Sequence, residues 1–333
     1  MSSQVLMGPL VQGFFSEHLA QHRQVSPQTI ASYRDTFRLL LEFLRDNKGI
    51  APAALTVDAL DAPTVLEFLE FLELERGNCV RSRNVRLTAI RSFFRVVALR
   101  EPRCLGIATR VMAIPVKRSD RPLVGYVTRA EVDAILATLD RRTWQGRRDY
   151  ALLLTMFNTG ARVSELTALR REQIHLSPAP AMHLEGKGRK QRIIPLWPNT
   201  AKVLRSWLEE AAPRPDSRAF PNRRRAPLTR FGVTRLLKEA VRTASSKCPS
   251  LLSKKVSPHR IRHGTAMALL QSGVDLALIA LWLGHESIET THKYIEADLA
   301  MKEKALGTLS PPEEKGRRRF KADDSLLAFL AKL

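Results

Sequence analysis

The sequence predicts a mainly α-helical protein of two domains. Apolar residues recur at spacings of three and four along most of the 333 residues, which is the periodicity of helices with one buried face. One segment, 182–196, instead has two short apolar runs around a glycine-containing turn, a pattern typical of a β-hairpin. Residues 100–122 lose the periodicity and contain several prolines, so they divide the chain. A chain of this length ordinarily forms two domains.

Four segments follow from these patterns. We expect a helical domain over 1–102, a linker over 103–122 and a second, mainly helical domain over 123–309 that carries the hairpin. The remaining segment, 310–333, is expected to be a basic tether followed by a short final helix. Its apolar residues form one stripe: Leu326, Leu327, Phe329, Leu330 and Leu333.

Three helices are predicted in the first hundred residues. One begins with Ser26 as N-cap and Pro27 at its first position, a second near Asp61, and a third near Ser82. The third has an apolar stripe on one face, and four arginines are predicted on the other: Arg83, Arg86, Arg91 and Arg95. These arginines could lie along phosphates or form a merely solvated basic face, and the pattern favours neither.

Cap and turn residues place the elements of the second domain. Thr128 and Glu131 have the spacing of a capping box that begins a helix. A further helix is predicted over about 146–159, ended by Gly160. Helices are also expected near Asn199, near Thr229 and after Ser257.

The net charge indicates a polyanionic partner. Lys and Arg number 54 against 33 Asp and Glu, which gives a formal charge of +21 and an isoelectric point near 10.6. Nucleic acid and an anionic membrane surface both fit such an excess. No apolar stretch approaches the roughly 18 to 20 residues of a bilayer span, and no signal peptide is visible, so nucleic acid is favoured. The 3 cysteines are far apart and in no CxxC pair, which fits a reducing cytosol and argues against a cysteine zinc site.

The helix after Ser257 begins with a candidate anion site. His259 and Arg262 are three residues apart in its first turns, so they share a face where the N-terminal N–H groups already favour an anion. A metal site is the alternative, because His259 and His263 have the spacing of an HExxH helix. The residues between them are Arg, Ile and Arg, with no Glu base, and guanidinium groups would repel a dication. The sequence therefore favours a phosphate and no metal.

Other candidate residues have ordinary structural explanations when each is taken alone. Arg162 and Glu165 have the spacing of a surface ion pair, which contributes little to stability. Lys187 lies in the hairpin turn, where a lysine is usually solvated, and Tyr294 would usually be a core or interfacial aromatic residue. His285 follows Leu283-Gly284 nine residues before Tyr294.

Taken in order, these segments resemble the tyrosine recombinase, or phage integrase, family. The resemblance extends over nearly the whole chain. It is strong in four places: Thr159-Gly-Ala-Arg162-Val-Ser-Glu-Leu, Gly186-Lys-Gly-Arg-Lys-Gln-Arg, His259-Arg-Ile-Arg262-His, and Leu283-Gly-His285 with Tyr294 beyond it. Any one motif is weak, whereas the ordered set is specific. Ile261 stands where the family commonly has Leu, a conservative departure.

The resemblance implies a role for each matched residue. Tyr294 would attack a DNA phosphodiester to give a 3′-phosphotyrosine and a free 5′-hydroxyl. Arg162, Arg262 and His285 would hold the phosphate oxygens. Lys187 would protonate the leaving 5′ oxygen, His259 would help to move the tyrosine proton, and Glu165 would support the basic cluster. The phosphotyrosine keeps the energy of the broken bond, so neither ATP nor another cofactor is expected.

The resemblance also implies how the protein works on DNA. We expect an enzyme of the integrase or transposase type that closes a two-domain clamp, with a SAM-like N-terminal domain, around double-stranded DNA. It would act as a homo-oligomer, a tetramer on two sites, with or without related recombinases and with a C-terminal helix docked on its own or a neighbouring subunit. Candidate DNA contacts are basic residues of both domains: Arg83, Arg86, Arg223, Arg224 and Arg225. A type IB topoisomerase-like nicking and closing enzyme and a non-cleaving DNA-binding helper remain as alternatives.

Overall fold

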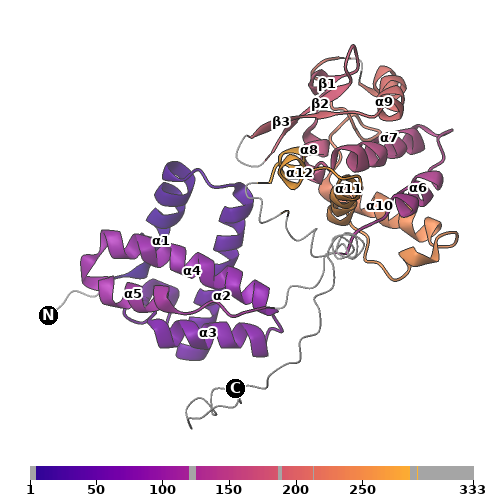
Figure 1. Ribbon diagram of the computed structural model, residues 1–333. Helices are drawn as coiled ribbons and strands as arrows, with labels where there is room; N and C mark the ends of the chain where they lie inside the picture. Colours follow the sequence, from indigo (N-terminus) through magenta and orange to yellow (C-terminus); the bar gives the residue numbers. More distant parts are fainter. Residues whose placement is uncertain (1–4, 120–124, 187–189, 213, 286–290, 292–333) are drawn as a thin grey trace, which may run out of the picture. The chain divides into compact units, whose positions relative to one another are not determined.

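The computed structural model describes residues 5–119, 125–186, 190–212, 214–285 and 291. The chain divides into two compact units, residues 1–121 and 122–333 (Figure 1). In the described parts of both units, no helix is long and apolar enough to cross a membrane.

The N-terminal unit is a bundle of α-helices, as predicted. Ser26 and Asp61 cap two of the expected helices, since their side chains accept hydrogen bonds from the backbone N–H groups of Thr29 and Thr64. A short helix and a π-helical segment, Phe14–His22, come before them and were not predicted. The α-helices are α1 (Met7–Gly13), α2 (Pro27–Lys48), α3 (Ala62–Leu74), α4 (Val80–Arg100) and α5 (Leu105–Ala113).

Helix α4 lies at the centre of this unit, which changes the expected placement of its arginines. It packs against α2, α3 and α5. Phe93 and Val96 are buried as well, although they lie outside the predicted stripe of Leu87, Ile90, Phe94 and Val97. The prediction that Arg83 lies on an outer face is therefore wrong: Arg83 is 3% exposed and its guanidinium donates to the carbonyl of Pro115 at 3.2 Å. Arg86 is half-buried and donates to the carbonyl of Ser32 at 3.0 Å.

The expected linker also differs from the structure. Residues 103–122 were predicted to lack regular structure, but Leu105–Ala113 forms α5, which packs on α4 and buries Ala108 and Val111. Pro102 and Pro115 lie on either side of the helix rather than inside it, so they are compatible with it. This helix therefore belongs to the N-terminal unit.

The C-terminal unit contains the predicted helices. Thr128 and Glu131 form the expected capping box, and Thr229 and Ser257 cap two later helices. Two short helices, α8 and α12, were not predicted. The unit comprises α6 (Arg129–Ala137), α7 (Trp144–Thr159), α8 (Val163–Ala168), α9 (Pro198–Ala211), α10 (Arg230–Ala244), α11 (Pro258–Gln271) and α12 (Leu276–Leu283).

The predicted hairpin is part of a small antiparallel sheet in the order β1–β2–β3. Strand β2 (Ala181–Glu185) pairs with β3 (Gln191–Pro195), with Met182 opposite Ile194 and Leu184 opposite Arg192. The short β1 (Ile174–His175) was not predicted and adds a third strand. Strand β3 packs against α12, and through this contact the hairpin is joined to the helices of the unit (Figure 1).

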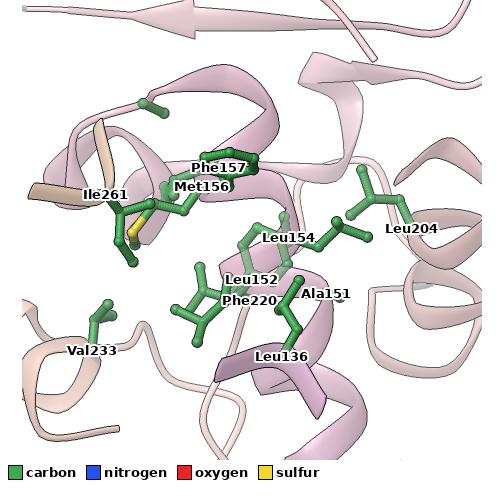
Figure 2. Close-up of a cluster of buried hydrophobic side chains, with 14 of the residues drawn as sticks. Leu136, Ala151, Leu152, Leu154, Met156, Phe157, Leu204, Phe220, Val233 and Ile261 are labelled. Carbon is green, nitrogen blue, oxygen red and sulfur yellow. The ribbon is translucent and has the colours of Figure 1, made fainter. Parts of the chain in front are cut away.

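Helix α7 forms the centre of the C-terminal core. Its residues 151–159 are all buried, because α9 and α11 pack against it. Figure 2 shows Leu152, Leu154 and Phe157 of α7 among side chains from other elements, including Leu136, Phe220 and Ile261. The helix ends at Gly160, whose φ of +60° suits glycine. A Cβ at Gly160 would lie 2.6 Å from Cδ2 of Leu283, so α12 approaches this end closely.

Candidate active site

The end of α12 holds two of the predicted site arginines. Nη1 of Arg262, which α11 carries, donates to the carbonyl of Gly160 at 2.7 Å, and its Nη2 donates to the carbonyl of Leu283 at 2.5 Å. Nη2 of Arg162, the residue that precedes α8, donates to the carbonyl of Gly284 at 3.2 Å. Three segments that are far apart in sequence therefore bring the two guanidinium groups to one place.

Glu165 is buried beneath Arg162 and accepts hydrogen bonds from two arginines. Its side chain is 3% exposed, and Oε1 lies 2.9 Å from Nη1 of Arg162, whose own side chain is 36% exposed. Arg192 of β3, 10% exposed, binds both carboxylate oxygens, at 3.1 Å and 2.7 Å. The backbone N–H of Arg162 also donates to Glu165, at 2.8 Å.

These contacts determine the charge of Glu165. Burial alone would raise the pKa of this carboxyl, but the hydrogen bond and charge of Arg192, with the hydrogen bonds of Arg162, outweigh burial and lower it. Glu165 is therefore ionised at neutral pH, and one buried carboxylate is shared by two guanidinium groups.

A pocket of about 290 Å³ brings Arg162, Arg262 and His259 together. His259 is exposed at the start of α11, with its ring centroid 4.2 Å from that of the buried His263. Ser257 caps this helix, and Ser257 and Pro258 line the same pocket, so the N-terminus of α11 borders it. Arg230, the first residue of α10, also lines the pocket. The surroundings are cationic and suit an anion.

A second pocket, of about 710 Å³, also has Arg162 in its lining. It is lined by Arg162, by His285, and by Gly186 and Lys190 from the two ends of the hairpin turn. Nδ1 of His285 lies 2.8 Å from Oγ1 of Thr291.

The structure thus places Arg262 and His259 with Arg162 in one pocket, His285 with Arg162 in the second, and Glu165 in contact with Arg162. Lys187 and Tyr294 lie outside the described residues.

The candidate DNA contacts differ in their surroundings. Arg223, Arg224 and Arg225 are all exposed in a turn where Oδ1 of Asn222 accepts from the backbone N–H groups of Arg224 and Ala226 at 2.9 and 3.0 Å. Arg83 is buried and Arg86 half-buried within the N-terminal unit, as described above.

Two site residues were not identified from the sequence. Arg192 was seen only as the end of the Gly186–Arg192 motif, although an arginine among the apolar residues of a predicted strand indicates a buried partner. Arg230 follows the predicted N-cap Thr229, and nothing in its local pattern distinguishes it from a solvated residue.

Within the described ranges, no three His, Cys, Asp or Glu side chains are grouped so that they could hold a metal ion. For the metal alternative raised from the sequence, His259 and His263 are adjacent but lack a third such ligand among these residues.

Comparison with known proteins identifies the family. Residues 126–301 match the phage integrase family, and residues 13–101 match the N-terminal SAM-like domain of phage integrases. The first match alone covers more than half of the chain. The chain therefore belongs to the phage integrase family, the tyrosine recombinases, which are enzymes of site-specific DNA recombination.

Relatives support this assignment over the full length. The chain is 49% identical over 333 residues to the protein named "Putative integrase/recombinase y4rC" of Sinorhizobium fredii, and the match covers 100% of both. It is 31% identical over 287 residues to the tyrosine recombinase XerC of Oceanobacillus iheyensis, covering 84% of this chain and 89% of the relative. The structure of XerH site-specific recombinase bound to a palindromic difH substrate has the same fold, with a TM-score of 0.70, 21% identity, and coverage of 86% of this chain and 81% of that one.

Proposed function

We propose that this enzyme cuts and rejoins DNA strands through a covalent bond to Tyr294. The observation that carries the proposal is the anchoring of Arg162 and Arg262 on the consecutive carbonyls of Gly284 and Leu283, directly before His285. Arg262 and His285 lie in the two pockets that Arg162 lines, so two further cationic or hydrogen-bonding groups accompany its guanidinium, as stabilisation of a phosphorane transition state requires.

The chemistry follows from the types of residue present. The phenolic oxygen of Tyr294 attacks the phosphorus, the bond to the 5′ oxygen breaks, and the product is a 3′-phosphotyrosine with a free 5′-hydroxyl. His259 accepts the phenolic proton, and Lys187 supplies a proton to the leaving oxygen. Arg162, Arg262 and His285 stabilise the charge on the non-bridging oxygens. Attack by a 5′-hydroxyl of a second duplex reverses the step and forms a Holliday junction.

Recombination involves two duplexes, so we propose that four subunits assemble on them, with or without related recombinases. The two domains would close around each duplex. The apolar stripe of 310–333 would join neighbouring subunits; this segment lies outside the described residues. Exposed arginines at 223–225 would bind phosphates. The reaction is expected in the cytoplasm.

A nicked suicide substrate tests the proposal. DNA from which the short fragment with the free 5′-hydroxyl diffuses away after cleavage should trap a covalent adduct that survives denaturation and is absent with Tyr294→Phe. DNA binding without any adduct would instead indicate a non-cleaving helper. A monomer that formed adducts and relaxed supercoiled DNA, but exchanged no strands between duplexes, would instead be a topoisomerase-like enzyme.

A further inference from the structure

The proposed chemistry gives no role to Arg192, which is among the most buried charged residues of the site. We propose that Arg192 is a positioning residue that neutralises Glu165 and ties the hairpin to the end of α12, so that the charge of Arg162 remains available to the scissile phosphate. This inference rests on the proposed function and assigns a further residue to the same site.

The guanidinium of Arg192 contacts two separate parts of the site. Its Nη1 and Nη2 bind both oxygens of Glu165, and its Nε donates to the carbonyl of Trp282 at 2.9 Å. Glu165 lies in α8 just after Arg162, and Trp282 lies three residues before His285. One side chain of β3 therefore joins the segments that carry Arg162 and His285.

The backbone leaves space for this guanidinium on two sides. A Cβ added at Gly284 would lie 3.2 Å from Nη1 of Arg192, and one added at Gly186 would lie 3.4 Å from the same atom. Gly284 also has a φ of +65°, which favours glycine. Both glycines line the pocket beside Arg162, so Arg192 is packed into the wall of the site.

Charge explains why a second arginine is needed. Glu165 is 3% exposed and 2.9 Å from Arg162, so this pair alone would have almost no net charge to offer a phosphate. A second guanidinium, bound to both carboxylate oxygens, leaves one positive charge in excess. Because Arg162 is the more exposed of the two arginines, at 36% against 10%, the excess is presented on the Arg162 side.

The position of Arg192 in the hairpin gives it a second effect. Arg192 and Ile194 lie on the same face of β3, which turns toward the interior of the unit, and Lys187 is five residues earlier in the chain. The Arg192–Glu165 contact therefore fixes the start of β3, the strand that follows Lys187 in the chain.

A comparison of two DNA substrates distinguishes this role from a purely structural one. Adduct formation is measured on a nicked suicide duplex with an ordinary phosphodiester and on the same duplex with an uncharged methylphosphonate at the scissile position. Arg192→Gln should lower the rate on the phosphodiester by about tenfold to a hundredfold. On the methylphosphonate, the rate of Arg192→Gln relative to the wild-type rate on the same substrate should fall about tenfold less. The reason is that the uncharged substrate has less negative charge to be balanced.

Arg147→Gln is the matched control. Arg147 also binds a glutamate through two hydrogen bonds, to Glu210 at 2.7 and 2.9 Å, but it lies in another pocket of the same unit. It should leave both rates unchanged. Arg192→Lys, which keeps the charge without the planar fork, should retain most of the phosphodiester rate.

Equal decreases on the two substrates, or no decrease on either, would overturn the proposal. Where thermal melting shows that Arg192→Gln is unfolded, Arg192→Lys decides: a large and equal decrease on both substrates contradicts the charge role, and a retained rate supports it. Failure of the wild type to form an adduct, or an adduct that persists in Tyr294→Phe, would contradict the proposed function instead.

Discussion

Arg262 and Arg162 hold consecutive carbonyls at the end of one short helix. Arg262 donates to Leu283 at 2.5 Å and Arg162 to Gly284 at 3.2 Å, and the next residue in the chain is His285. The spacing of the two guanidinium groups is therefore set by adjacent peptide units, which are rigid. Catalysis by fixed charges benefits from this arrangement, because little reorganisation is needed when charge develops.

Removal of one of these arginines should slow cleavage far more than it weakens DNA binding. Arg162→Ala should cost about 3 kcal/mol of transition-state stabilisation, or about a hundredfold in the rate of adduct formation at saturating protein. The measurement is single-turnover trapping on the suicide substrate, with Arg147→Gln as the control. An alanine variant that formed adduct at the parental rate would show that Arg162 does not hold the phosphate.

Gly160 should be sensitive to a single added methyl group. Its φ is +60°, and a Cβ would lie 2.6 Å from Leu283, whose carbonyl binds Arg262. Gly160→Ala combines backbone strain with displacement of α12, so we expect a decrease of about 2 to 4 kcal/mol in unfolding free energy and slower cleavage.

Gly273→Ala is the control for that substitution. Gly273 also has a positive φ, +82°, but nothing lies within 4 Å of its Cβ position. It should cost only about 1 kcal/mol and leave the rate of cleavage unchanged. Denaturant unfolding followed by tryptophan fluorescence provides the measurement, because all 4 tryptophans are in the C-terminal unit. Equal decreases in the two variants would contradict a special role for the contact between Gly160 and Leu283.

Local sequence signals predicted most of the C-terminal unit. Ser257, Thr229 and the Thr128–Glu131 box act through hydrogen bonds within a few residues, so their helices could be assigned from the chain alone. The hairpin could be assigned from its two short apolar runs around a glycine-containing turn. Helix α12 has apolar residues all around, so it has no distinctive periodicity, and α8 has only six residues.

The errors concern residues whose surroundings depend on distant contacts. Arg83 has the position of an outward-facing residue on α4, but it is buried and bound to the carbonyl of Pro115 in the chain after α5. Arg192 has a buried partner 27 residues earlier in the chain, and no local spacing reveals that pair. The family motifs named the residues of the site, but they did not show that Arg162 and Arg262 share the end of α12.

The pH dependence of stability should have opposite signs at two buried carboxyls. The pKa of Glu165 is lowered from 4.5: burial opposes this shift, and its two arginines outweigh burial. Its contribution is therefore fully present above pH 4.5 and disappears as the pH falls through the lower folded-state pKa. The pKa of Asp149 is raised from 3.8 by burial, against the opposing effect of Arg148, so its unfavourable contribution is relieved on acidification.

Paired variants test these signs. Glu165→Gln should be less stable than the wild type by about 3 kcal/mol at neutral pH, since it leaves Arg192 buried without its charged partner. That difference in unfolding free energy should shrink below pH 4.5. The gain in unfolding free energy of Asp149→Asn over the wild type should be largest at neutral pH, where Asp149 is charged. Tryptophan fluorescence in denaturant, repeated from about pH 3 to about pH 7, provides the data. A difference for Glu165→Gln that grew as the pH fell would contradict the lowered pKa.

The arginine turn should contribute to DNA affinity through phosphates. Arg223, Arg224 and Arg225 are exposed, and replacing each with Ser should weaken binding similarly on all sequences. For every phosphate that an arginine no longer binds, the slope of log affinity against log salt should become shallower by about 0.9. Binding titrations at several salt concentrations measure this slope, with Arg147→Gln as the control. An unchanged slope in the triple variant would show that the turn does not bind DNA.

Arg83 should affect folding rather than DNA binding. Its Nη1 donates to the carbonyl of Pro115 and to Oδ1 of Asn84, and Nδ2 of Asn84 donates to the carbonyl of Lys117 at 2.8 Å, so this pair holds the chain after α5 against α4. Burial also lowers the pKa of Arg83 from its usual value, as expected for a guanidinium away from water. Arg83→Met should remove about 1 to 3 kcal/mol of stability from the N-terminal unit.

The two units report this change separately. The N-terminal unit contains no tryptophan, so tryptophan fluorescence reports only the C-terminal unit. Arg83→Met should lower the midpoint at which the N-terminal helices unfold, followed by far-ultraviolet circular dichroism, and leave the midpoint of the tryptophan transition unchanged. Arg95→Met, at an exposed position of α4, should change neither transition. At a temperature where both variants are folded, Arg83→Met should keep the salt slope of the wild type, because its guanidinium is bound to carbonyl and amide oxygens of its own unit. A reduced slope with normal unfolding would instead make Arg83 a DNA contact, and the N-terminal unit would then have to open around it when DNA binds.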